Sequence, residues 1–129
     1  MASLDDVQRI VLSLPATVAE QDQSAFAVMN KGKPKGIAWL WLERLHPKKS
    51  RVPNRGVLAV RVADIEEKDM LLAARPAALF TEPHYAGYPA VLVRLAAIDP
   101  SELEELLVNA WRCQAPPALV RAFDQQPPP

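Results

Sequence analysis

Three strand-like segments follow one another between residues 24 and 62 with no helical pattern between them. They are SAFAVMN (24–30), GIAWLWLE (36–43) and VLAVRV (57–62), and the connections between them contain Gly and Pro. Parallel strands need a long crossover, usually a helix, whereas antiparallel strands are joined by turns. The order of segments therefore predicts an antiparallel meander at the centre of the fold.

Helical patterns surround this meander. Apolar residues recur at helical spacing from Leu4 to Leu14 and from Leu103 to Trp111. Asp64 and Asp99 are typical N-caps, and they predict helices that start at Ile65 and Pro100. The remaining expected elements are a connector at 16–23, a short strand at 79–80, a strand at 90–95 and a short helix at 118–123. We predict an α+β fold with two layers, in which helices cover mainly one face of an antiparallel β-sheet. Residues 1–124 form a single domain in this prediction, and residues 125–129 form a disordered, proline-rich tail.

Charge is distributed unevenly along the chain. The formal net charge is zero, but the segment 31–55 contains eight basic residues and one acid, Glu43, so it carries +7 and the rest carries −7. Such a block concerns binding partners more than fold, because clustered Lys and Arg attract polyanions. The eight basic residues are Lys31, Lys33, Lys35, Arg44, Lys48, Lys49, Arg51 and Arg55.

Several classes of protein do not fit the composition. The N-terminus is acidic where a signal peptide is basic, and no apolar run approaches the ~20 residues of a membrane span. Cys113 is the only cysteine, and we expect it to be a buried or half-buried apolar side chain. No Ser or Cys is accompanied by a base and an acid, and the two histidines, His46 and His84, lack metal-ligand spacing. We therefore expect a cytoplasmic protein that is not an enzyme, with no cofactor, no bound metal and no membrane partner.

Alternation along the strands places Arg61 and Arg94 on the outer face of the sheet, opposite the apolar positions of their own strands. Trp39 and Trp41 are two residues apart and share one face of their strand, while Ala38, Leu40 and Leu42 share the other. If helices cover only one face of the sheet, one of these two sets points away from them. Exposed tryptophans are able to stack on nucleic-acid bases, to form a dimer interface or to pack under a loop. We interpret the tryptophans mainly as core or interface residues.

The segment TEPHYAGYPAVLVRL (81–95) places aromatic and turn-forming residues ahead of a strand. Gly87 and the prolines are turn formers, and the tyrosines are suited to cover an edge of the core. We interpret this loop mainly as architecture. An alternative is a site for a small anionic ligand, lined by His84, Tyr85 and Arg94.

This segment, the C-terminal stretch DPSELEELLVNAWRCQAPPALV (99–120) and the opening LDDVQRIVLSLPATVAE (4–20) resemble the MmcQ/YjbR-like family of small bacterial proteins. The resemblance implies a frataxin-like (CyaY-like) fold. It also implies DNA binding, which is ascribed to the family by analogy with a double-wing arrangement of hairpins. No catalytic motif of the family is carried over to this sequence.

These observations predict a nucleic-acid-binding accessory protein. The eight basic residues would contact phosphates through two loops, and Trp39 or Trp41 would stack on bases. The main alternative is a protein-interaction module that forms a homodimer or binds an acidic partner through the Trp-bearing sheet face. The third hypothesis for the function is the binding of a small anionic ligand in the pocket described above.

Overall fold

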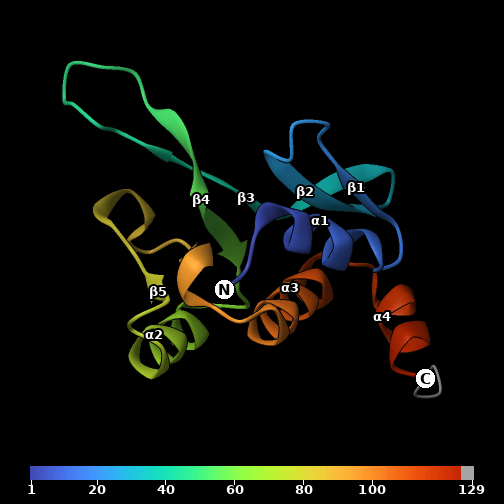
Figure 1. The fold of residues 1–129 in the computed structure, drawn as a ribbon. Coiled ribbons are helices and arrows are strands. Elements are labelled where there is room, and N and C mark those ends of the chain that lie inside the picture. The colour runs from blue at the N-terminus through green and yellow to red at the C-terminus, as the bar shows by residue number, and fades with distance from the viewer. Residues whose placement is uncertain (126–129) are drawn as a thin grey trace.

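The computed structural model describes residues 1–125, so the predicted tail lies, apart from Gln125, outside the described residues. Six strands form one antiparallel sheet in the order β1-β2-β3-β4-β6-β5. The α+β prediction with an antiparallel sheet is confirmed (Figure 1). The strands are β1 (Thr17–Ala19), β2 (Ala25–Asn30), β3 (Lys33–Glu43), β4 (Val52–Arg61), β5 (Leu79–Phe80) and β6 (Ala90–Arg94). The helices are α1 (Leu4–Leu12), α2 (Ile65–Ala74), α3 (Pro100–Gln114) and α4 (Pro117–Asp124), with 3-10 turns η1 (Pro83–Tyr85) and η2 (Leu95–Ala97).

Helices α1 and α3 cover the inner face of the sheet and bury the predicted stripes. Ser3 and Asp6 form a capping box at the start of α1, in which each side chain accepts from the other residue's backbone N–H. Leu107 and Trp111 of α3 are fully buried, and the Trp111 Nε1 donates to the Pro15 carbonyl at 2.9 Å. The main core therefore lies between these two helices and the sheet.

Strands β3 and β4 are longer than the sequence predicted. We expected 31–35 and 44–56 to be loops, but β3 already begins at Lys33 and β4 at Val52. Pro34 and Pro53 are the reason for this error, since proline argues against a strand. Each lies where its strand has a single neighbour: Pro34 pairs only with β2 and Pro53 only with β3. A strand with one open side tolerates proline, because a missing N–H is able to face solvent there.

Two further expectations were wrong. The segment 16–23 contains strand β1, which pairs with β2 although it is three residues long. Cys113 is exposed, because it lies on the outer side of α3 next to the buried Trp111. Within residues 1–125 no helix is long and apolar enough to cross a membrane.

Candidate functional site

The β3–β4 hairpin extends away from the body of the protein (Figure 1). Between residues 43 and 56 it carries five basic residues and a single acid, Glu43, whose carboxylate accepts from the Asn54 side chain at 3.0 Å. Three of the five basic residues are arginines whose guanidinium groups donate hydrogen bonds to backbone carbonyls. Arg44 donates to the Pro47 and Lys49 carbonyls, Arg51 to that of Leu42 and Arg55 to that of Asp22, at 2.9 to 3.2 Å.

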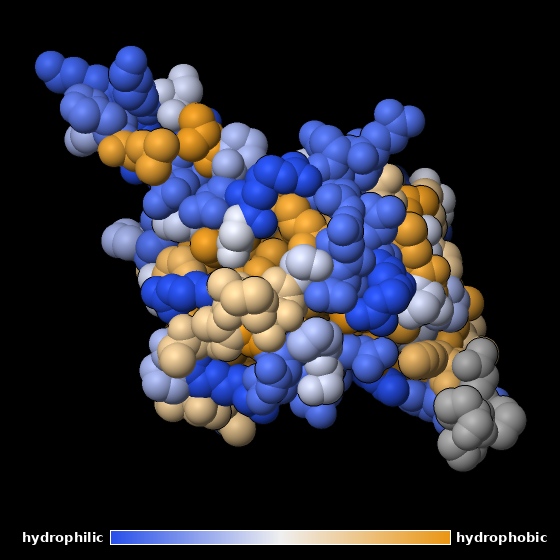
Figure 2. Space-filling view, viewed as in Figure 1, coloured by the Kyte–Doolittle hydropathy of each residue, from blue (hydrophilic) through white to orange (hydrophobic). Residues whose placement is uncertain are grey.

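The basic side chains of this hairpin form no ion pairs with the carboxylates of residues 1–125. Among the described residues, no carboxylate forms an ion pair with any of the eight basic side chains between Lys31 and Arg55. Lys48 and Lys49 are exposed near the tip. Hydrophilic side chains dominate the tip in Figure 2, with hydrophobic ones nearer the body. The hairpin thus presents ammonium and guanidinium groups to solvent.

The second basic segment lies at the opposite end of β3. Its turn consists of Lys31 and Gly32 alone, both with positive φ (54° and 78°), as in a two-residue hairpin. Lys33 and Lys35 are exposed strand residues. Because β3 has 11 residues, its two ends are separated by about 35 Å. The structure therefore does not bring the two predicted basic loops together into one patch.

The Trp-bearing face of the sheet is partly covered by the loop that follows β5. Trp39 and Trp41 belong to a small second core on this outer face, with Ala59, Leu92 and others. The Trp39 Nε1 donates to the Tyr85 hydroxyl at 3.1 Å, and the Trp39 ring also meets Tyr88 edge-on. Of the two sets that the sequence left open, the tryptophans are the one that points away from the helices, and the face that carries them is not open.

A buried lysine fixes this loop. Lys68 of α2 is 3% exposed, and its ammonium donates to the carbonyls of Tyr85 at 2.6 Å and Tyr88 at 2.9 Å. Burial lowers the pKa of Lys68 below its ordinary value, and the nearby Asp69 carboxylate opposes this shift. Gly87, between the two tyrosines, has φ 78°, as its turn requires. The Lys68 hydrogen bonds therefore support the interpretation of this loop as a structural element.

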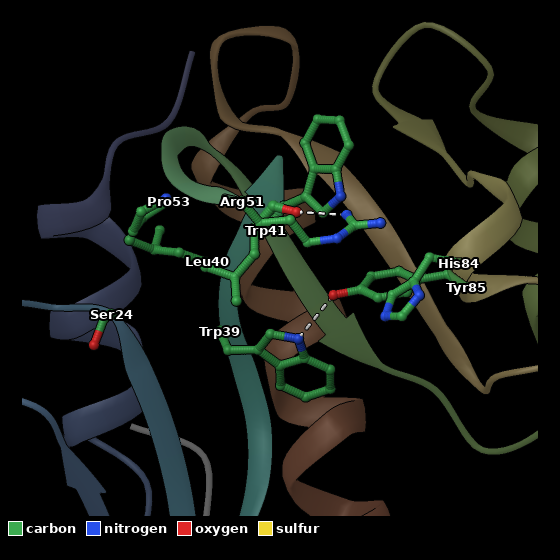
Figure 3. Close-up of a pocket in the computed structure, with 9 residues that line it drawn as sticks. Ser24, Trp39, Leu40, Trp41, Arg51, Pro53, His84 and Tyr85 are labelled. Atoms are coloured by element: carbon green, nitrogen blue, oxygen red, sulfur yellow. Dashed lines mark hydrogen bonds between the residues drawn. The ribbon is translucent and has the colours of Figure 1, made fainter. Parts of the chain in front are cut away.

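Between this loop and the hairpin lies a pocket of about 320 Å³. Figure 3 shows Trp39 and Trp41 reaching it from β3, His84 and Tyr85 from the loop, and Arg51 from the hairpin side. Its volume is at the lower end of the ~300–1,000 Å³ found for small-molecule sites. The pocket combines aromatic walls with a cation.

The pocket gathers most, but not all, of the residues that the ligand alternative named. His84 and Tyr85 line it, whereas Arg94 does not. The Arg94 guanidinium lies over the Phe80 ring, 4.1 Å from its centre, and donates to the Ala77 carbonyl at 3.4 Å. Arg51 supplies the positive charge instead. No pattern in the sequence indicates that Arg51 takes this position, because Arg51 and His84 are distant in the chain.

The Trp41 indole N–H is buried and has no hydrogen-bond partner among the described residues. Leaving a buried donor unpaired costs about 1–3 kcal/mol, so such a group calls for an acceptor. Trp41 lines the pocket. Its nitrogen has almost no accessible surface, so an acceptor oxygen bound in the pocket would reach it only after a small shift of the side chains around it. Within residues 1–125 no three His, Cys, Asp or Glu side chains cluster as metal ligands.

Comparisons with known proteins agree with the fold. A family model described as YjbR matches residues 12–113. Uncharacterized proteins of Mycobacterium tuberculosis and Mycobacterium bovis are each 45% identical over 129 residues, covering 95% of this chain and 96% of the relative. The crystal structure of a Deinococcus radiodurans protein with a DUF419 domain superposes with a TM-score of 0.62 at 20% identity, covering 86% of this chain and 77% of that one.

Proposed function

The chain belongs to the YjbR family, and we propose that it is a non-enzymatic, cytoplasmic nucleic-acid-binding protein whose β3–β4 hairpin contacts phosphates. The observation that carries the proposal is the projecting hairpin with five basic residues and no ion pair to a carboxylate within residues 1–125. Lys and Arg that displace counterions from a phosphate backbone supply most of non-specific nucleic-acid affinity.

The arrangement of the arginines supports a preformed contact surface. Arg44, Arg51 and Arg55 each use part of the guanidinium to hold a backbone carbonyl, which limits the conformations of the hairpin. A guanidinium has five N–H donors, so others remain for phosphate oxygens. A preorganised surface loses less conformational entropy on binding than a mobile one.

The proposal assigns the principal contact to the hairpin alone. Lys31, Lys33 and Lys35 are about 35 Å away at the other end of β3, and they form a separate basic surface. They line a shallow depression with Asn30 and Pro117. These lysines provide a matched control for the hairpin, since their removal changes net charge equally.

A second candidate is a protein-interaction module, and exposed apolar side chains on the hairpin favour it. Leu42, Leu45 and Val52 are 49%, 72% and 41% exposed. Together with the basic residues they would suit an acidic partner or a second copy of the chain. This candidate differs in its response to salt, because apolar burial is strengthened by kosmotropic salts whereas phosphate contacts are weakened by all salts.

The experiment is a binding titration of the wild-type protein against a fluorescent duplex DNA over a series of NaCl concentrations. We expect the logarithm of the affinity to fall linearly with the logarithm of salt, with a slope of about −0.9 per phosphate contacted. Size-exclusion chromatography in parallel reports the oligomeric state. An absence of binding at low salt, or an affinity independent of salt, would contradict the proposal; a salt-resistant dimer would favour the second candidate.

A further inference from the structure

The pocket beside the hairpin has features that a phosphate-binding surface alone does not need. Trp39, Trp41 and Tyr85 give it flat aromatic walls, and the buried Trp41 N–H has no acceptor in the described part of the chain. Arg51 connects the two regions, since it lines the pocket and belongs to the basic hairpin. A ligand that fits this set is planar, carries an acceptor oxygen and is joined to a phosphate.

We infer that the pocket accommodates an unpaired nucleobase of a single-stranded nucleic acid while the hairpin holds the adjoining phosphates. The inference rests on the proposed function and specifies its substrate as single strands. Bases stack on aromatic side chains in proteins that bind single strands, and pyrimidine carbonyl oxygens are suitable acceptors for an indole N–H. A duplex offers only its phosphates to the same surface, because its bases are paired and stacked.

The pocket is held open from two sides. The Trp39 Nε1 bond to the Tyr85 hydroxyl fixes the loop wall against the strand wall, and the Arg51 bond to the Leu42 carbonyl fixes the hairpin wall. Lys68 anchors the loop from behind through the carbonyls of Tyr85 and Tyr88. The walls therefore do not depend on a ligand for their positions, which favours binding without large rearrangement.

The test compares three probes at one low salt concentration: an oligothymidylate of about ten nucleotides, within the range of single-strand site sizes, an abasic strand of equal length, and a matched duplex. The abasic strand keeps every phosphate and removes every base. We expect the oligothymidylate to bind at least about tenfold more tightly than the abasic strand, the gain expected from one stacked base, and to quench tryptophan fluorescence.

Trp41→Phe keeps an aromatic wall and removes the N–H. It is expected to weaken oligothymidylate binding about fivefold, the loss for one hydrogen bond, and to leave the abasic strand unaffected. Trp111→Phe is the matched control, because Trp111 is fully buried in the main core and lines no part of the pocket. It should leave binding of both strands unchanged.

Equal affinity for the oligothymidylate and the abasic strand would overturn the base pocket and leave the hairpin proposal standing. If no strand and no duplex binds, the proposed function itself fails. A titration with thymidine monophosphate, read by tryptophan fluorescence, then separates a nucleic-acid strand from a free nucleotide as the ligand. If the nucleotide quenches the wild type but not Trp41→Phe, and no strand binds, the single-strand assignment is overturned in favour of a free nucleotide.

Discussion

Alanine at both Lys48 and Lys49 is expected to weaken binding to every duplex tested and to reduce the magnitude of the salt slope by about 1.8, or 0.9 for each lost phosphate contact. Phosphate contacts position a protein without reading bases, so the loss should be independent of sequence. If the affinity extrapolated to 1 M salt is unchanged, the affinity of the double variant near 50 mM salt is lower than that of the wild type by a factor on the order of a hundred. The measurement is fluorescence anisotropy over a salt series.

The matched control is Lys33→Ala with Lys35→Ala. It removes the same charge at the other end of β3, where both side chains are also exposed. We expect its salt slope to equal that of the wild type. The stability of both double variants should change by less than about 0.5 kcal/mol, since exposed charges contribute little to folding. Equal losses in the two variants would show that total charge, and not the hairpin, determines binding.

Lys68→Met is expected to lower the free energy of unfolding by about 1–3 kcal/mol. Methionine fills the space of the lysine stem but cannot donate, so the carbonyls of Tyr85 and Tyr88 lose their partner inside the loop. The same change should weaken oligothymidylate binding, because this loop forms one wall of the pocket. Urea denaturation measures the first effect. Lys35→Met is the exposed control and should change stability by less than about 0.5 kcal/mol.

The difference in stability between the wild type and Lys68→Met also depends on pH. Because burial lowers the pKa of Lys68 in the folded protein below its ordinary 10.5, the unfolded chain binds more protons between those two values. The contribution of Lys68 to the stability of the wild type therefore rises with pH in that range. Methionine does not titrate, so the stability difference between wild type and Lys68→Met should grow from neutral pH toward about pH 10. A difference that shrinks over this range would contradict the pKa shift.

The sequence was sufficient for the parts of the fold that depend on local patterns. The stripes of α1 and α3 and the shared face of Trp39 and Trp41 follow from spacings of 3.6 and 2 residues. The start of α2 follows from its N-cap residue, Asp64. Strand β1 was missed because three residues are too few to establish a period. The extension of β3 and β4 was missed because an edge position, which tolerates proline, is a tertiary property.

The candidate site was predictable only in part, for a related reason. Its basic residues are contiguous in the sequence, so the charge block revealed them. The pocket joins residues far apart, as the Trp39–Tyr85 hydrogen bond spans 46 positions, and no local pattern reports such a contact. Lys68 was missed because a lysine on a helix is usually exposed; its burial depends on carbonyls that a distant loop supplies.

The position of the contact surface on the molecule is the central claim, and an NMR titration tests it most directly. Oligothymidylate would be added to ¹⁵N-labelled wild-type protein while backbone amide chemical shifts are recorded. The account predicts that the largest changes fall in the hairpin at residues 44–52 and at the indole N–H of Trp41, with residues 31–35 nearly unchanged. Largest changes at 31–35, or on the helices with the hairpin unaffected, would contradict it.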